Sequence, residues 1–226
     1  MHQFLVKELP NVMTKLPELK DCIIQTLVMI SISGIIAFIL GMIIGIVLIA
    51  TKKGGVFENK IVFNIVDKII NIVRSIPFII LLTAAIPLSR LIVGTAIGTK
   101  GAIVPLILGT VPFFSRQVES ALSEVDDGVI EAAKSMGTGP FGVIFRVYLR
   151  ESIPSITRVT TITFISLIGL TAMAGAIGGG GLGDFAIRYG YQRYQHDVTC
   201  ITILILLLLV SIIQFFGNLI IKKTTH

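Results

Sequence analysis

Long uncharged runs alternate with short charged segments along this chain. Residues 22–51 contain no charged side chain, and Asp21 and Lys52 bound this run. Residues 159–183 and 198–221 form two further uncharged runs. A helix needs ~20 apolar residues to cross a bilayer, so each of these runs is long enough to do so. The pattern predicts a membrane protein whose spans are helices.

Two shorter apolar stretches contain prolines and adjoin polar helical segments. Residues 57–74 have the periodicity of a helix with one polar side, and Pro77 should kink this helix where it enters the membrane. Residues 101–115 contain Pro105 and Pro112. Lipid does not tolerate unpaired backbone groups, so such helices belong beside protein or a watery path. We therefore expect one all-α transmembrane domain over 22–222, with spans near 22–51, 61–89, 100–122, 154–181 and 198–221.

The ends of the chain predict its orientation in the membrane. Residues 1–21 contain charges and two prolines, unlike the apolar core of a signal peptide, and we expect an amphipathic segment outside the cytoplasm. If the long segment 116–158 lies in the cytoplasm, more lysines and arginines lie inside than outside. This bias predicts a multi-pass protein of the cytoplasmic membrane with its N-terminus outside and its C-terminus inside.

Composition excludes several classes of function. The chain is 54% hydrophobic and only 14% charged, too apolar for a soluble domain, and its net charge of +6 fits basic cytoplasmic loops better than nucleic-acid binding. Cys22 and Cys200 lack partners at metal-ligand spacing, so we expect no metal site. The sequence contains no P-loop motif and no credible catalytic pair. We therefore expect a protein that is not an enzyme and holds no cofactor of its own.

A glycine pattern near the fourth run is a poor nucleotide-site candidate. Gly178, Gly180 and Gly183 satisfy the spacing G-x-G-x-x-G. A dinucleotide site also needs an acidic residue ~20 positions later, and Ile203 stands there instead. The glycines fit close backbone packing or a loosened helix end better.

The segment 124–153 is too long for a tight turn and has the pattern of two short helices. Asp126 and Asp127 can cap the first helix, and Gly137 stands where a left-handed C-terminal cap is expected. Pro140 can begin the second helix, and Pro154 should stop it. On physical grounds alone, a docking element and a hairpin that merely links two spans both remain open.

The residues Glu131-Ala132-Ala133, followed by Gly137, resemble the EAA motif of permease subunits of bacterial ABC importers. In that family the motif forms a coupling helix, here 127–137, that docks on an ATPase subunit. The resemblance implies coupling roles for Glu131, Ala132, Ala133 and Gly137. The family pattern has a proline where this chain has Arg150, so the two differ at that end of the motif.

Two longer segments narrow the resemblance. Residues 71–106 and 172–194 are similar to permeases of methionine importers, which are type I importers with five spans. The resemblance implies a homodimeric permease that works with two ATPase subunits, which bind ATP and magnesium, and with an external substrate-binding lipoprotein. Alternatives within the class are another small amino acid or a methionine-containing peptide. An ion-coupled carrier or channel is the alternative from a different class.

The positions of the acidic residues favour an energy source outside this chain. Ion-driven transporters usually place an acid near the middle of the membrane, and the three longest uncharged runs contain none. Asp67 stands beside Lys68, and Glu119 lies one turn from Arg116. Asp67 and Glu119 are each either part of a local charge pair or near the cytoplasmic gate, where Arg116 and Glu119 are the candidate inner-gate pair.

The fourth span contains hydroxyl side chains that suit a neutral amphipathic solute. Ser166, Thr171 and Met173 are the candidates for lining a pathway. Plain packing is the alternative for Met173, because methionine fills irregular apolar gaps well.

Overall fold

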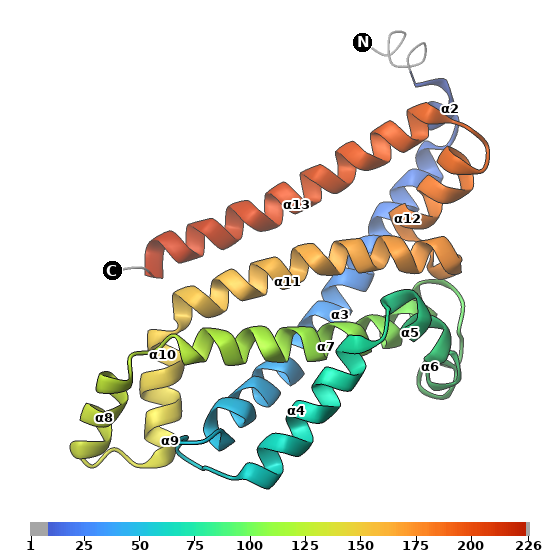
Figure 1. The fold of residues 1–226 in the computed structure, drawn as a ribbon. Helices are drawn as coiled ribbons and strands as arrows, with labels where there is room; N and C mark the ends of the chain where they lie inside the picture. Colours follow the sequence, from blue (N-terminus) through green and yellow to red (C-terminus); the bar gives the residue numbers. More distant parts are fainter. Residues whose placement is uncertain (1–8, 225–226) are drawn as a thin grey trace. The chain divides into compact units, whose positions relative to one another are not determined.

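A computed structural model describes residues 9–224, and every regular element in that range is a helix (Figure 1). Four stretches are long and apolar enough to cross a membrane. They are α3 (Leu16–Thr51), α7 (Gly98–Ser123), α11 (Ile153–Ala174) with its continuation to Gly179, and α13 (His196–Thr224). These helices correspond to four of the five expected spans.

The second expected span is divided into separate helices. α4 (Lys60–Ser75), α5 (Phe78–Ala84) and α6 (Ile86–Val93) share the stretch predicted as one kinked helix. Ile76 and Pro77 both have extended backbones, with ψ of 122° and 133°. Proline lacks an N–H and disfavours a helical conformation in the residue before it. Pro77 therefore ends one helix and caps the next, where the sequence predicted a kink.

The N-terminal segment differs from its expected boundary at residue 21. α2 (Pro10–Thr14) is a short helix, and α3 begins at Leu16, six residues before the uncharged run. Residues 1–8 of the predicted amphipathic segment lie outside the described residues. Glu18 in the first turn of α3 interacts favourably with the helix dipole, so a charged turn can precede the apolar part of the helix.

The domain expected over 22–222 divides into two compact units. Unit 1 comprises 9–35, 77–107 and 164–213. It contains α2, α5, α6, the π-helical turn η2 (Gly175–Gly179), α12 (Gly181–Phe185) and η3 (Ala186–Tyr191). One of its cores joins α3, α7 and α11 through Met29, Leu106 and Leu167, and a second joins α2, α3, α12 and α13.

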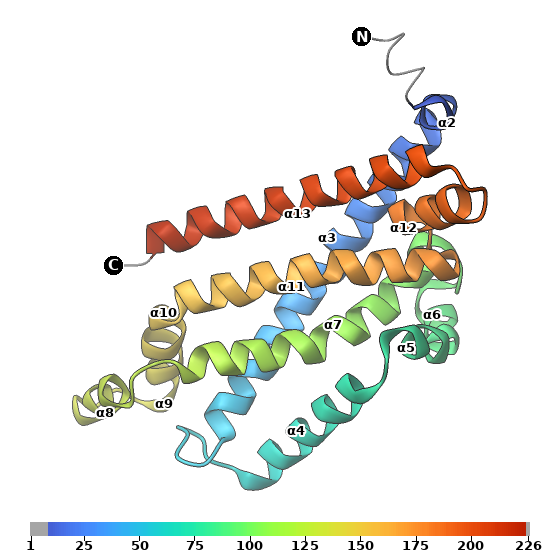
Figure 2. The same cartoon turned by 45° about the horizontal axis from the view of Figure 1, so that its top comes forward.

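Unit 2 comprises 36–76, 108–163 and 214–224. It contains α4, α8 (Asp127–Ser135), α9 (Pro140–Gly142), the π-helix η1 (Val143–Tyr148) and α10 (Leu149–Glu151). Its core joins Ile49 of α3, Phe114 and Val118 of α7, and the loop helices α8 and η1. Figures 1 and 2 show α8, α9 and α10 beyond the adjoining ends of α7 and α11.

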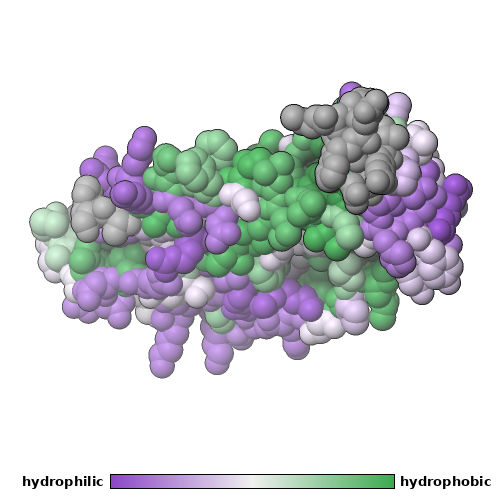
Figure 3. All heavy atoms as spheres, turned by 90° about the horizontal axis from the view of Figure 1, so that it is seen from above, coloured by the Kyte–Doolittle hydropathy of each residue, from purple (hydrophilic) through white to green (hydrophobic). Residues whose placement is uncertain are grey.

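Apolar side chains also lie on the surface of the long helices. Leu204, Leu207 and Leu208 of α13 are between 56% and 60% exposed. Apolar residues occupy a broad area of the face drawn in Figure 3. Continuous apolar surface of this kind is unfavourable in water and suits lipid or another protein chain.

Candidate functional site

Helix α8, which contains the EAA residues, starts at the predicted cap. Asp126 has an extended backbone, and its carboxylate accepts a hydrogen bond of 2.8 Å from the N–H of Gly128. Asp127 follows in the first turn, where a negative charge interacts favourably with the helix dipole. The predicted capping of this helix by its aspartates is confirmed.

The end of α8 is fixed by a left-handed residue. Gly137 has φ of +80°, and its N–H donates to the carbonyl of Lys134 at 3.0 Å. The N–H of Thr138 donates to the carbonyl of Ala133, also at 3.0 Å. These two bonds form a Schellman motif, which ends helices where a glycine can adopt a positive φ. The predicted left-handed C-terminal cap at Gly137 is confirmed.

The three EAA residues face in different directions. Ala133 is 6% exposed and packs with Ile130 in the core of unit 2, whereas Glu131 and Ala132 are exposed. Met136, near the end of the helix, is 79% exposed. The resemblance implied coupling roles for both alanines. Ala133 instead anchors α8 to its own unit, leaving Glu131 and Ala132 on the free surface.

The second half of the loop begins as predicted and ends differently. Pro140 is the first residue of α9, as expected. The helical segment ends at Glu151, before Pro154, and Pro154 is the second residue of α11. A proline in the first turn costs no hydrogen bond, because that N–H has no partner within the helix. Pro154 therefore helps to start α11, where the sequence predicted a stop.

A cluster of charges in unit 2 contains the predicted pair Arg116–Glu119. The guanidinium of Arg116 donates to the Glu119 carboxylate at 2.5 Å, to the side-chain oxygen of Asn71 at 3.3 Å and to the carboxylate of Asp67. Asp67 also accepts from the Asn71 amide at 3.0 Å. The predicted local pair of Asp67 with Lys68 is wrong, because Asp67 pairs with Arg116 on another helix. The inner cluster, Asp67, Asn71, Arg116 and Glu119, thus joins α4 to α7.

The predicted pathway residues of α11 differ in exposure. Ser166 is exposed and Met173 is 41% exposed. The two residues are seven positions apart, about two helical turns, so they lie on the same side of the helix. Thr171 is 2% exposed, and its hydroxyl donates to the carbonyl of Ile168 at 2.7 Å. Ser166 and Met173 can therefore face a pathway, while the hydroxyl of Thr171 is used within its own helix.

Sequence reasoning missed a second arginine cluster, in unit 1. Arg188 donates to Asp184 at 2.5 Å and forms an ion pair with Glu18 at 3.0 Å. The hydroxyl of Tyr189 donates to the other oxygen of Glu18 at 2.8 Å. The spacing of Asp184 and Arg188 by four residues could have indicated their pair. Nothing in the sequence places Glu18 beside them. We call Glu18, Asp184, Arg188 and Tyr189 the outer cluster.

The ring of Tyr189 is surrounded by cations. Lys15 and Arg193 lie 5.0 and 4.8 Å from the ring centroid, and Arg188 lies 5.2 Å from it. The hydrogen bond to the Glu18 carboxylate and burial of the side chain raise the pKa of Tyr189. The phenol therefore stays protonated at neutral pH and remains a hydrogen-bond donor.

The chain is similar to proteins of known classes over most of its length. The profile of the family described as "Binding-protein-dependent transport system inner membrane component" matches residues 37–226. The "Probable D-methionine transport system permease protein MetI" of Vibrio cholerae is 47% identical over 202 residues, covering 89% of this chain and 90% of that protein. The "Methionine import system permease protein MetP" of Bacillus subtilis is 46% identical over 173 residues, covering 76% and 78%.

Solved structures share the fold. A chain of the MetNI methionine ABC transporter in an inward-facing conformation is 42% identical, with a TM-score of 0.91, and the match covers 94% of this chain and 99% of that chain. An amino acid ABC transporter is 18% identical with a TM-score of 0.79, which shows the fold alone. The expected all-α permease fold is confirmed. The chain belongs to the family of inner membrane components of binding-protein-dependent transport systems.

Proposed function

We propose that this chain is the non-catalytic, membrane-spanning subunit of an ATP-driven importer that moves methionine into the cytoplasm. Two relatives with high identity are named methionine permeases, and a similar solved chain belongs to a methionine ABC transporter. Loop charges support an external N-terminus and an internal C-terminus.

Helix α8 is the proposed docking element for the ATPase subunit, and its geometry is the observation that carries the proposal. Its inner side, Ile130 and Ala133, packs in the core of unit 2, while Glu131 and Ala132 stay exposed. Both ends are capped, so the helix is held in one conformation before any partner binds. Pre-organisation of this kind lowers the entropy cost of docking. In this arrangement ATP and magnesium bind to the partner.

Two copies of the chain would form the pathway, and an external binding protein would supply the substrate. Ser166 and Met173 lie on an exposed side of α11, which suits either a pathway or contact with a second copy. A hydroxyl and a thioether beside apolar residues fit a neutral amphipathic solute better than an ion. The family description, a binding-protein-dependent system, supports the third component.

The inner cluster is a candidate for the cytoplasmic gate. Arg116 joins α4 and α7 through Asp67, so relative movement of the two helices would stretch this ion pair. In alternating access, nucleotide binding shifts the balance between two conformations through contacts that differ between them. We expect the inner cluster to change its contacts between these conformations.

Uptake by proteoliposomes tests the proposed function. The permease would be reconstituted with its ATPase subunit and binding protein, and uptake of radiolabelled methionine would be measured with unlabelled amino acids as competitors. We expect uptake to require ATP inside and to persist when ionophores collapse all ion gradients. If this chain alone supports uptake, and if that uptake stops when the ion gradient is collapsed, the protein would instead be an ion-coupled carrier.

A further inference from the structure

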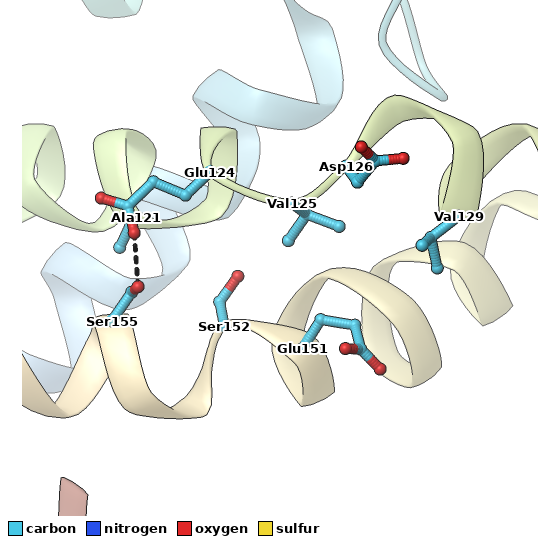
Figure 4. Close-up of a pocket in the computed structure, with 8 residues that line it drawn as sticks. All are labelled: Ala121, Glu124, Val125, Asp126, Val129, Glu151, Ser152 and Ser155. Atoms are coloured by element: carbon cyan, nitrogen blue, oxygen red, sulfur yellow. Dashed lines mark hydrogen bonds between the residues drawn. The ribbon is translucent and has the colours of Figure 1, made fainter. Parts of the chain in front are cut away.

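A hollow of about 230 Å³ lies in unit 2 between the end of α7, the start of α8 and the turn from α10 to α11 (Figure 4). Its polar lining comes from both sides, and these residues are Glu124, Asp126, Glu151, Ser152 and Ser155. One water occupies ~30 Å³ in the liquid, so the hollow has room for the end of a large side chain.

The charge of the hollow is entirely negative. Glu124, Asp126 and Glu151 contribute three carboxylates, and no basic residue is part of the lining. Within residues 9–224, none of the three forms an ion pair. Glu124 accepts a hydrogen bond of 2.5 Å from Ser155, and Asp126 accepts one from Gly128. Most of the acceptor capacity of these carboxylates is therefore free for a ligand.

A buried hydroxyl in the same hollow points independently to a ligand. Ser152 is 2% exposed, and its hydroxyl oxygen has no hydrogen-bond partner among the described residues. Figure 4 shows this hydroxyl directed away from its own helix, into the space toward Glu124 and Val125. Leaving a buried hydroxyl unpaired is unfavourable, and such groups usually have a protein, water or ligand partner.

We propose that this hollow binds an arginine side chain of the ATPase subunit. Three carboxylates in one hollow favour a cation, and no group of three or more His, Cys, Asp or Glu among the described residues could hold a metal ion. A guanidinium is larger than a metal ion, planar, and carries five N–H donors that pair with separate carboxylates. Its remaining donors would reach the Ser152 hydroxyl, which can accept a hydrogen bond.

The position of the hollow matches the proposed docking surface. Val129 lines the hollow and is 45% exposed on α8, so the hollow continues the surface offered to the ATPase. The N-terminus of α8 itself disfavours a cation, but Asp126 and Asp127 place negative charge there. This inference rests on the proposed function, because it names the partner group that the docking surface receives.

The bound arginine would contact the ends of two spans at once. Glu124 follows the last residue of α7, and Ser152 precedes the first residue of α11. The bond between Ser155 and Glu124 already links these two ends. A guanidinium among them would transmit movement of the ATPase to α7 and α11 together, in addition to any movement transmitted through docking on α8.

Binding of the purified ATPase subunit to the permease in lipid nanodiscs tests the proposal. We expect Glu124→Gln and Glu151→Gln each to raise the dissociation constant about tenfold. Each replacement leaves a desolvated guanidinium short of one charged acceptor. Ser152→Ala should raise the dissociation constant about fivefold through loss of one hydrogen bond. Asp126 is left unchanged, because its substitution would uncap α8.

Glu58→Gln is the matched control. Glu58 is an exposed carboxylate of unit 2 outside the hollow, and glutamine can still accept the hydrogen bond from Gly54. We expect this variant to bind the ATPase within twofold of the unchanged protein. Equal effects of Glu58→Gln and Glu151→Gln would overturn the proposal, because they would show only a general effect of charge.

Arginine replacements in the ATPase identify the occupant. Each surface arginine would be changed to lysine and combined with Glu151→Gln in a double-mutant cycle. We expect to find one arginine whose replacement weakens binding in the unchanged permease but weakens it little further in the Glu151→Gln variant. If the unchanged ATPase binds normally but no arginine is coupled to Glu151, the proposed arginine site is rejected and the proposed function is not. No binding of the unchanged ATPase would instead reject the proposed function.

Discussion

The two units each contain an arginine shared by two carboxylates, but the two clusters are built differently. In the inner cluster, Arg116 is the one cation among residues 9–224 that forms ion pairs with Asp67 and Glu119. In the outer cluster, Glu18 is bound by both Arg188 and the hydroxyl of Tyr189. The side chain of Arg116 is 27% exposed and that of Arg188 is 42% exposed.

This difference shows where each unit is vulnerable to substitution. Removing Arg116 would leave two carboxylates without a cation in a partly buried place. Removing Arg188 would take away the ion-pair partner of Asp184, but Glu18 would keep its phenol donor, and Lys15 and Arg193 would remain beside Tyr189. A connection that depends on one residue can be broken during a transport cycle. The outer cluster, with several donors, is suited to holding helix ends together.

The largest expected contrast concerns the two ends of the chain and the side of the membrane that each end reaches. In a Cys200→Ser background, we would place single cysteines at Lys20 in unit 1 and at Lys223 in unit 2, both exposed. A membrane-impermeant maleimide should label position 20 in intact spheroplasts and position 223 only after permeabilisation. Cys22 is buried and should react little. Labelling of position 223 in intact spheroplasts would require a different number of spans or an inverted chain.

Replacement of the two arginines should separate the clusters by stability. Arg116→Met should lower the free energy of unfolding by about 2 kcal/mol, a discounted value because the cluster is only partly buried. Arg188→Met should cost about 1 kcal/mol, because the remaining donors serve Glu18. Unfolding in mixed detergent micelles measures both. Adding Asp67→Asn to Arg116→Met should restore part of the loss, and equal losses for the two arginine variants would remove the contrast.

Alanine replacement of two glycines with positive φ, one in each unit, compares the two units at the level of the backbone. Gly137 ends α8 and Gly94 ends α6 with φ of +76°, and neither has an atom near the position of an added Cβ. Alanine should therefore cost about 1 kcal/mol of stability at both positions through backbone strain alone. Only Gly137→Ala should also lower ATP-driven uptake, by about fivefold if 1 kcal/mol of docking is lost. Loss of uptake in Gly94→Ala as well would remove the special role of α8.

The smallest effect concerns the buried tyrosines. Tyr189→Phe removes the donor to Glu18 and should cost about 1 kcal/mol or less. Tyr148 of unit 2 is 5% exposed, and none of its described hydrogen bonds involves its hydroxyl, so Tyr148→Phe should change stability very little. Thermal unfolding followed by circular dichroism compares the two. A larger loss for Tyr148→Phe than for Tyr189→Phe would contradict this order.

The sequence predicted best those features that depend on local chemistry. Three of the four long spans follow from long runs without charge, α7 follows from the shorter apolar stretch 101–115, and the caps of α8 follow from Asp126 and Gly137, because each depends on neighbouring residues. The break at Pro77 was placed correctly but underestimated. Proline affects both its own N–H and the residue before it, and Ile76 adopts the extended conformation.

Contacts between distant residues could not be predicted from one sequence. Asp67 has Lys68 beside it, yet it pairs with Arg116, 49 positions away. Adjacent residues of a helix point in different directions, so the neighbouring lysine was the wrong partner. Likewise, the burial of Ala133 and the exposure of Ala132 depend on which side of α8 meets the core. Only the folded chain contains that information.

The π-helical turn η1 fixes the direction in which the residues after it point. A π-helix accommodates one more residue in its turn than an α-helix, and here Val143, Ile144, Val147 and Tyr148 all reach the core. Deletion of one residue within 143–148 would restore ordinary α-helical winding at no cost in backbone hydrogen bonds. Residues after the deletion would keep nearly their present direction, because the wider π-turn spreads about the same rotation over one more residue. The same extra residue in an ordinary α-helix would turn Ser152 and the start of α11 by about 100°, so η1 reconciles the length of this segment with the direction of the helix that follows it.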